Sequence, residues 1–178
     1  MEIILAENYG FCYGVKRAVE MADEAANSEG KSYTLGPIIH NPQVVGRLES
    51  KGVSPIQEVA DIDEGTMIIR SHGVGPAIYA EAEEKGLHIL DATCPHVKKA
   101  QQDAKSVIED GMTLVILGEK NHPEVKSINL WANNRGIIIE DEESAEKLQI
   151  VEKMGVVVQT TFSQFKFNSI IEILEKKS

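Results

Sequence analysis

Two cysteines of this chain lie where a thiolate could do chemistry, because each directly precedes a predicted helix. Cys12 stands in the loop Gly-Phe-Cys-Tyr-Gly, and Cys94 stands in Asp-Ala-Thr-Cys-Pro. Pro95 favours the first turn of a helix and therefore places Cys94 at or near an N-cap, where free N–H groups and the helix dipole favour a thiolate. Such a thiolate suits a nucleophile, a redox thiol or a metal ligand, whereas a lone intracellular Cys is more often a small buried hydrophobe. Two thiolates alone complete no common metal site, so zinc or an iron–sulfur cluster would need further donors.

The cysteines belong to an internal repeat that also contains two histidines. Cys12 and His40 are 28 positions apart, and Cys94 and His122 are also 28 apart. Each of the two histidines is followed closely by a proline, and a third loop follows each pair, with Ser-His in one half and Thr-Thr in the other. The repeat predicts two similar modules, residues 1–95 and 96–178, whose cysteines meet at one centre.

His40, His72 and His122 are candidate ligand-binding residues because each follows a predicted strand in a loop with Gly or Pro. Imidazoles, helix N-termini and Gly-rich backbone N–H groups together can hold a phosphate or diphosphate. His88, at the start of a strand, and His96, at the start of a helix, are interpreted as structural.

Glu124 and Thr160 complete the candidate set. Glu124 falls in the first turn of a predicted helix, where a carboxylate ordinarily complements the helix dipole. In a pocket of histidines and thiols the same group is a candidate proton donor. Thr160 and Thr161 either cap the last helix or donate hydroxyl hydrogen bonds to a substrate.

Alternating strands and helices must position these loops. We expect buried strands at 3–6, 33–39, 66–70, 87–91, 113–117, 137–139 and 156–158. Helices are expected along 15–26, along 44–48, between Pro76 and Gly86, and from Pro95, His122, Glu142 and Ser163. This alternation predicts an α/β fold with parallel sheets flanked by helices, whose functional residues follow the carboxyl ends of strands.

Composition bounds the class of protein. The 178 residues are 42% hydrophobic and carry a formal net charge of −10, which disfavours a nucleic-acid partner. The sequence contains no run of about 18 apolar residues, so we expect no membrane-spanning helix. The N-terminal residues lack the basic region of a signal peptide. Two cysteines make no disulfide framework, so a cytoplasmic location is expected.

Six loop motifs, taken together and in order, closely resemble the LytB/IspH family. They begin at Gly10 (Gly-Phe-Cys-Tyr-Gly-Val-Lys-Arg-Ala), Ile39 (Ile-His-Asn-Pro), Ser71 (Ser-His-Gly-Val), Asp91 (Asp-Ala-Thr-Cys-Pro), His122 (His-Pro-Glu-Val) and Gln159 (Gln-Thr-Thr). The resemblance covers essentially the whole chain. The family reduces 4-hydroxy-3-methylbut-2-enyl diphosphate in the last step of the non-mevalonate isoprenoid pathway.

The resemblance implies a trefoil of three α/β modules around a [4Fe–4S] cluster that is held by one cysteine from each module. Cys12 and Cys94 match cluster ligands, His40, His72 and His122 match substrate contacts, Glu124 matches the proton-relay acid, and Thr160 matches a further substrate contact. The implied products are isopentenyl and dimethylallyl diphosphate, with a low-potential donor such as ferredoxin or flavodoxin as partner. No nucleic acid or membrane partner is implied.

The chain departs from the family pattern in one important respect. The third cysteine and the Ser-Asn-rich diphosphate loop belong to a third module that these 178 residues lack, and the residues before His122 are not the small ones usual there. We therefore expect two modules of the trefoil, apo and inactive by themselves. The alternatives are a diphosphate-binding module without catalysis and a thiol enzyme that uses cysteine, histidine and Glu124.

Overall fold

Two parallel sheets organise the chain in this computed structural model, which describes residues 3–4, 7 and 9–177. The strand order is β2-β1-β3-β4 in the first sheet and β6-β5-β7 in the second. The strands are β1 (Ser32–Leu35), β2 (Val53–Ile56), β3 (Thr66–Ile69), β4 (His88–Asp91), β5 (Thr113–Leu117), β6 (Ile137–Ile139) and β7 (Met154–Val158). Every pairing between neighbouring strands is parallel, which confirms the predicted α/β class.

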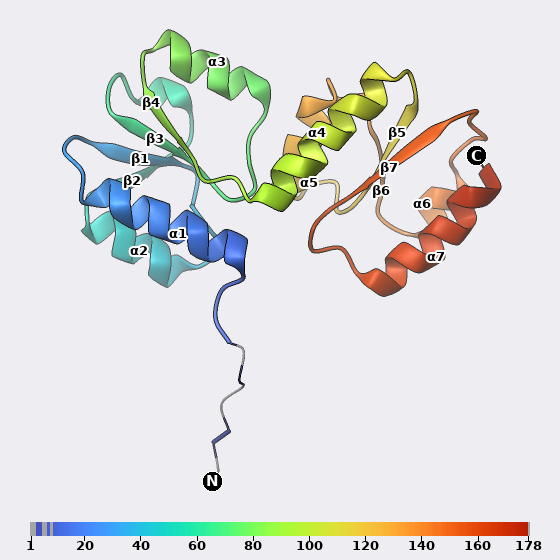
Figure 1. The fold of residues 1–178 in the computed structure, drawn as a ribbon, viewed down its shortest axis with the longest axis horizontal. Helices are drawn as coiled ribbons and strands as arrows, with labels where there is room; N and C mark the ends of the chain where they lie inside the picture. Colours follow the sequence, from blue (N-terminus) through green and yellow to red (C-terminus); the bar gives the residue numbers. More distant parts are fainter. Residues whose placement is uncertain (1–2, 5–6, 8, 178) are drawn as a thin grey trace.

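Helices cover both faces of each sheet (Figure 1). They are α1 (Tyr13–Ala26), α2 (Pro42–Ser50), α3 (Pro76–Glu84), α4 (Pro95–Glu109), α5 (Pro123–Trp131), α6 (Glu142–Glu146) and α7 (Gln164–Leu174), with short 3-10 turns at Val59–Asp61 and Glu175–Lys177. α1 and α2 lie on one face of the first sheet and α3 on the other, while α4 and α5 lie between the two sheets (Figure 1). The chain passes from the first sheet to the second through α4, and α5 joins β5 to β6 within the second sheet.

Alternation along β5 explains how the second sheet buries both faces. Leu114 and Ile116 pack with residues of α4 and α5, whereas Val115 and Leu117 pack with residues of α6 and α7. Successive strand residues point to opposite faces, so a run of apolar residues is what a strand covered on both sides requires. The sequence Thr-Leu-Val-Ile-Leu meets this requirement.

Prolines fix where four helices begin. Proline occupies the first helical turn of α2, α3, α4 and α5, where its restricted φ suits a helix and its missing N–H costs nothing. The residue before each proline is consequently the N-cap. In α4 that residue is Cys94 and in α5 it is His122, so a local rule places two candidate site residues at helix N-termini.

Several predicted boundaries need correction. The strand expected at 33–39 ends at Leu35, because Gly36 has a φ of +70° and Pro37 follows it. Of the strand expected at 3–6, Ile3 and Ile4 have no strand structure and are 75% and 83% exposed, while residues 5 and 6 lie outside the described residues. Strand β2 was not predicted because Pro55 interrupts it, but β2 is an edge strand, where proline is tolerated.

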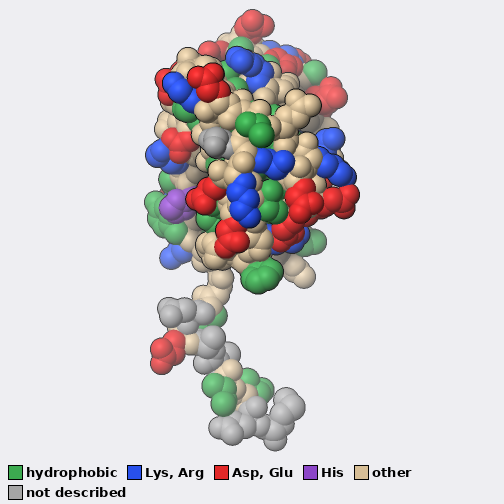
Figure 2. Space-filling view, turned by 90° about the vertical axis from the view of Figure 1, so that its right-hand side faces the viewer, with side chains coloured by type: hydrophobic (Ala, Val, Ile, Leu, Met, Phe, Trp, Pro, Cys, Tyr) green, Lys and Arg blue, Asp and Glu red, His purple; other side chains and the backbone are tan. Residues whose placement is uncertain are grey.

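Surface charge is mixed on the side of the molecule that carries α6 and α7. Figure 2 shows acidic and basic side chains intermingled there, and an ion pair joins Glu143 of α6 to the adjacent Lys147 at 2.6 Å. The net charge of −10 is therefore not gathered into a single acidic patch on this face. Among the described residues, none of the helices has the length and apolar character needed to cross a membrane.

Candidate functional site

Three histidines form a cluster where the two modules meet. The ring centroids of His40 and His72 are 4.8 Å apart, those of His72 and His122 are 5.4 Å apart, and those of His40 and His122 are 6.5 Å apart. One ring nitrogen from each residue lies within 4.8 Å of the others. Such a donor set suits an anion that accepts several hydrogen bonds, and it is also the type of set that a transition metal ion accepts.

Each histidine follows the carboxyl end of a strand. His40 follows β1, His72 follows β3, and His122 follows β5 of the other sheet. Carboxyl ends of parallel strands lie at one edge of a sheet, and the two sheets turn these edges toward the same place. The sequence predicted these three residues as one group, and the structure brings them together.

The hydrogen bonding of His122 fixes its tautomer. Its Nδ1 accepts the backbone N–H of Glu124 at 3.2 Å, as an N-cap side chain does. An accepting Nδ1 carries no proton, so the proton of the neutral ring lies on Nε2. This leaves Nε2 as a hydrogen-bond donor toward the cluster.

His72 is held in its neutral form. Burial is the largest cause that lowers its pKa to about 4, and the charges of the neighbouring His40, His122 and Arg70 contribute the rest of this shift. Its Nδ1 is buried without a hydrogen-bond partner among the described residues. His72 therefore meets a ligand as a neutral hydrogen-bond donor or acceptor at neutral pH.

The lowered pKa of His72 predicts a dependence of stability on pH. The unfolded chain binds this proton near pH 6.5 and the folded chain only near pH 4, so the free energy of unfolding is fully retained above 6.5 and falls as the pH drops toward 4. We expect a loss of roughly 1 to 3 kcal/mol over this window, measured by urea unfolding at a series of pH values. His72→Asn should flatten the curve in this window, whereas the exposed His96→Gln should not. An unchanged slope in His72→Asn would contradict the prediction.

Glu124 is buried and bound to the last loop of the second module. Only 2% of its surface is exposed. Oε1 accepts the backbone N–H of Thr160 at 2.6 Å, and Oε2 accepts the Thr160 hydroxyl at 2.8 Å. Helix α7 is capped by Ser163, so capping is not the role of Thr160. Glu124, in the first turn of α5, and Thr160, in the loop after β7, instead form a hydrogen-bonded pair.

The two cysteines both occupy helix N-caps and converge through the start of α1. Cys12 is the exposed N-cap of α1, and Cys94 is the half-buried N-cap of α4. Gly14 lies in the first turn of α1, and a Cβ added there would stand 2.5 Å from the Cys94 sulfur. The Cys94 thiol therefore reaches the helix turn that Cys12 begins, in a space that exists only because residue 14 has no side chain.

Arg17 strengthens this contact between α1 and the loop before α4. Its guanidinium donates to the carbonyl of Thr93 at 3.2 Å and to that of Asp91 at 3.4 Å. These bonds join residues more than 70 positions apart. They hold the loop of Cys94 against the helix of Cys12.

A buried chain of hydrogen bonds from α4 and α5, called the relay below, holds the backbone of His72. The Gln101 amide donates to the Ser127 hydroxyl at 3.1 Å, and this hydroxyl lies 2.8 Å from the His72 carbonyl, to which it donates. Trp131 donates its ring N–H to the Val74 carbonyl at 2.9 Å. Helices α4 and α5 thus hold the loop 72–74 of the first module. Sequence reasoning missed this relay, although a Gln and a Ser on the otherwise apolar inner faces of two helices were a signal for buried hydrogen bonds.

Replacing Ser127 tests the relay. Ser127→Ala leaves the buried Gln101 amide and the His72 carbonyl without this partner, and we expect a loss of about 1–3 kcal/mol in the free energy of unfolding. Ser106→Ala, at an exposed position of α4, is the matched control and should change stability by less than about 0.5 kcal/mol. Equal effects of both substitutions in urea titrations would show that the relay contributes nothing.

The remaining sequence-predicted positions lie apart from the cluster. His96 is exposed at the start of α4, and His88 is exposed in β4, with Nδ1 3.4 Å from the Thr66 hydroxyl. Both fit the structural interpretation. Thr161 accepts a hydrogen bond from the Gln159 amide at 2.9 Å, which shapes the loop next to Thr160.

Known proteins resemble this chain along its whole length. Residues 3–178 match the family described as LytB protein. A protein of Geobacter metallireducens, named 4-hydroxy-3-methylbut-2-enyl diphosphate reductase, is 48% identical over 178 residues, which are 99% of this chain and 63% of that relative. A protein of Pelobacter propionicus with the same name is 49% identical over the same shares of the two chains. The chain thus spans about 63% of the length of these curated relatives.

Two solved structures share the fold. The E-1-hydroxy-2-methyl-but-2-enyl-4-diphosphate reductase of Plasmodium falciparum superposes with a TM-score of 0.90 at 31% identity, covering 96% of this chain and 55% of that one. A structure described as (E)-4-hydroxy-3-methyl-but-2-enyl diphosphate reductase, the terminal enzyme of the non-mevalonate pathway, gives a TM-score of 0.83 at 43% identity. It covers 97% of this chain and 63% of that one.

Proposed function

The chain belongs to the LytB family, and from this premise we propose that it supplies the substrate-binding half of a reductase for 4-hydroxy-3-methylbut-2-enyl diphosphate. The single observation that carries the proposal is the histidine cluster beside a buried carboxylate. His40, His72 and His122 share one centre, and Glu124 lies two residues beyond His122. Relatives that this chain matches carry the name of that reductase.

The histidines would hold the diphosphate. His122 offers Nε2 as a donor because its Nδ1 already accepts a backbone N–H, and the neutral His72 adds a donor that needs no counter-charge. Pro123 gives α5 its first turn next to the cluster, so the positive end of the helix dipole faces the same region. This local arrangement can bind an anion in a chain whose net charge is −10.

Cys12 and Cys94 fit as two ligands of an iron–sulfur cluster. Both thiols lie at helix N-caps, and Gly14 leaves space beside the Cys94 sulfur. We assign the further ligand to the part of the relatives that these 178 residues do not span. When bound, the [4Fe–4S] cluster would supply the electrons of the reaction.

Glu124 and Thr160 would deliver a proton to the oxygen that leaves as water. The overall change adds two electrons and two protons to the allylic alcohol, breaks its C–O bond and releases water, which leaves isopentenyl or dimethylallyl diphosphate. The Thr160 hydroxyl donates a hydrogen bond to Oε2 of buried Glu124, and Thr160 is itself an exposed residue. The pair can therefore pass a proton from carboxyl to hydroxyl to the leaving oxygen.

A second candidate, diphosphate binding without catalysis, applies to the 178 residues by themselves. The histidine cluster is complete within them, whereas a [4Fe–4S] cluster needs more than two thiolates. The third hypothesis, a thiol enzyme, gains no support, because no hydrogen bond joins Cys94 to a histidine or to Glu124 within residues 9–177. The division into modules 1–95 and 96–178, a ferredoxin or flavodoxin donor and a cytoplasmic location remain parts of the proposal.

The proposal is tested by joining this chain to the part of a relative that the chain does not span. We define the full-length chimera as residues 1–178 followed by the remaining sequence of the Geobacter metallireducens relative. Loaded with iron and sulfide under anaerobic conditions, it should reduce 4-hydroxy-3-methylbut-2-enyl diphosphate with reduced methyl viologen as donor. The 178-residue chain alone should bind the substrate without turnover. A chimera that binds iron but does not consume the substrate would refute the proposed activity.

A further inference from the structure

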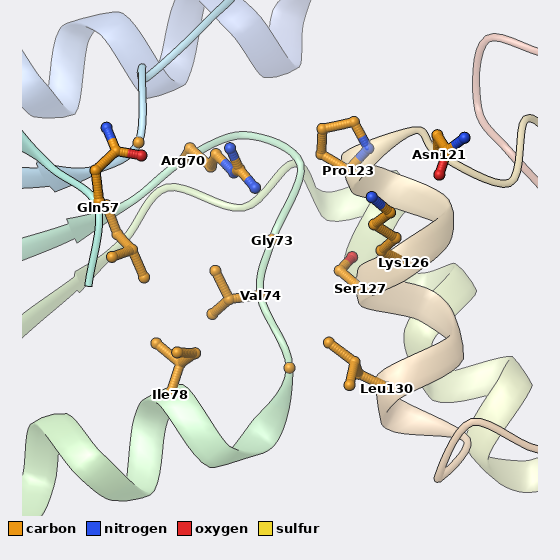
Figure 3. A pocket seen from close by; sticks show the side chains of 13 residues that line it. Gln57, Arg70, Gly73, Val74, Ile78, Asn121, Pro123, Lys126, Ser127 and Leu130 are labelled. Atoms are coloured by element: carbon orange, nitrogen blue, oxygen red, sulfur yellow. The ribbon is translucent and has the colours of Figure 1, made fainter. Parts of the chain in front are cut away.

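A pocket lies behind the histidine loops, between the first sheet and α5. Its volume is about 390 Å³, a size that suits a small molecule. The loop after β3 forms its floor and α5 forms one wall (Figure 3). None of the three clustered histidines lines it.

Arg70 lines this pocket with a guanidinium that is partly buried and incompletely hydrogen-bonded. Burial lowers the pKa of its guanidinium, which means that the cation has lost part of its hydration. Its Nε is buried without a hydrogen-bond partner among the described residues. Gly36 makes room for it, because a Cβ at this position would stand 2.9 Å from Nη1 of Arg70. The fold therefore positions a partly desolvated cation for which the described residues provide no ion-pair partner.

Lys126 adds a second cation on the opposite wall. It is an exposed residue of α5, and neither Lys126 nor Arg70 takes part in an ion pair within the described part of the chain. No Asp or Glu lines the pocket. The pocket is thus lined by two cations and by no carboxylate, although the chain has a net charge of −10, and an anion is the ligand that would neutralise the two cations.

The other half of the pocket is apolar. Figure 3 shows the Arg70 and Lys126 side chains in one half and Val74, Ile78 and Leu130 in the other. Val74 is 8% exposed and Leu130 is 42% exposed, so the apolar wall is open enough to receive a hydrocarbon group. A ligand that matches both halves has a charged head and a short apolar tail.

We propose that this pocket binds a phosphate or diphosphate ester of a short hydrocarbon, at a site distinct from the histidine cluster. Arg70 binds the phosphate oxygens with its planar fork, Lys126 adds a point charge, and the apolar wall covers the tail. Ser127 links the two sites, because it lines the pocket and its hydroxyl donates to the His72 carbonyl. The site does not depend on the proposed reductase activity, although the products proposed above belong to this ligand class.

Titrations of the 178-residue chain with dimethylallyl diphosphate and with inorganic pyrophosphate test the proposal. Trp131 is the only tryptophan, and its ring N–H bonds to the carbonyl of Val74 in the pocket wall, so its fluorescence reports on the site. Calorimetry gives the affinities. We expect Arg70→Met and Lys126→Met each to weaken binding at this site about tenfold or more, and the ester to bind more tightly than pyrophosphate because of its tail.

Two control variants locate the site. His40→Asn combined with His122→Asn alters the histidine cluster while keeping a good N-cap on α5, and it should leave the fluorescence response unchanged. Lys105→Met removes an exposed cation of α4 that pairs with Glu109, and it should not weaken binding. Should Arg70→Met fail to fold, the exposed Lys126→Met alone decides. The proposal is overturned if the response disappears in the histidine variant, if Lys105→Met weakens binding as much as Lys126→Met, if ester and pyrophosphate bind equally, or if the unaltered chain does not respond at all.

Discussion

Glu124→Gln is expected to lower turnover of the full-length chimera by about 100- to 10,000-fold, the range typical for removal of a general acid. The carboxyl is 2% exposed, and both of its oxygens are engaged by Thr160. Glutamine has the same shape and its carbonyl oxygen can still accept the Thr160 N–H, but its amide cannot deliver a proton. Steady-state reduction of 4-hydroxy-3-methylbut-2-enyl diphosphate measures the effect.

Two comparisons separate a proton-transfer defect from a folding defect. Substrate affinity of the 178-residue Glu124→Gln chain should stay close to that of the unaltered chain, because the histidines are untouched. Glu119→Gln removes an exposed carboxylate from the same loop and should retain full turnover. If Glu124→Gln kept more than half of the turnover, Glu124 would not be the proton donor.

If the proposed iron–sulfur cluster binds at Cys12 and Cys94, Gly14→Ala is expected to lower the affinity of the full-length chimera for it by about 10- to 100-fold, as changes next to metal ligands do. The added methyl group would stand 2.5 Å from the Cys94 sulfur, so the thiol must move away from the turn that Cys12 begins. Iron content per chain and visible absorbance after anaerobic reconstitution measure the loss without reference to activity. Cys94→Ser provides the reference for complete loss of one ligand.

Gly46→Ala is the matched control for Gly14→Ala. Gly46 also lies inside a helix, and nothing is within 4 Å of a Cβ added there. Alanine in place of a helical glycine should raise the free energy of unfolding by about 0.5–1 kcal/mol and leave iron binding unchanged. Normal iron content in Gly14→Ala would mean that the space beside Cys94 is not used by a cluster.

The sequence by itself determined most helices and strands, and with them the loops that contain the candidate site residues. Apolar runs such as 113–117 gave strands with the predicted bounds, since covering both faces of a sheet needs continuous apolar residues. Pro95 and Pro123 fixed helix starts and so placed Cys94 and His122 at N-caps. These outcomes depend on residues adjacent in the chain, and adjacent residues are what a sequence pattern reports.

Tertiary structure alone decided the long-range hydrogen-bond partners and the pocket away from the histidines. Thr160 bonds to Glu124 across 36 positions and Ser127 to the His72 carbonyl across 55, and no local pattern specifies such partners. The contact of Gly14 with the Cys94 sulfur and the pocket of Arg70 and Lys126 likewise arise from packing α1 and α5 against loops of distant sequence. The physical reason is that periodicity and restricted dihedral angles act within a few residues, whereas burial and hydrogen-bond partners are set by how whole elements pack.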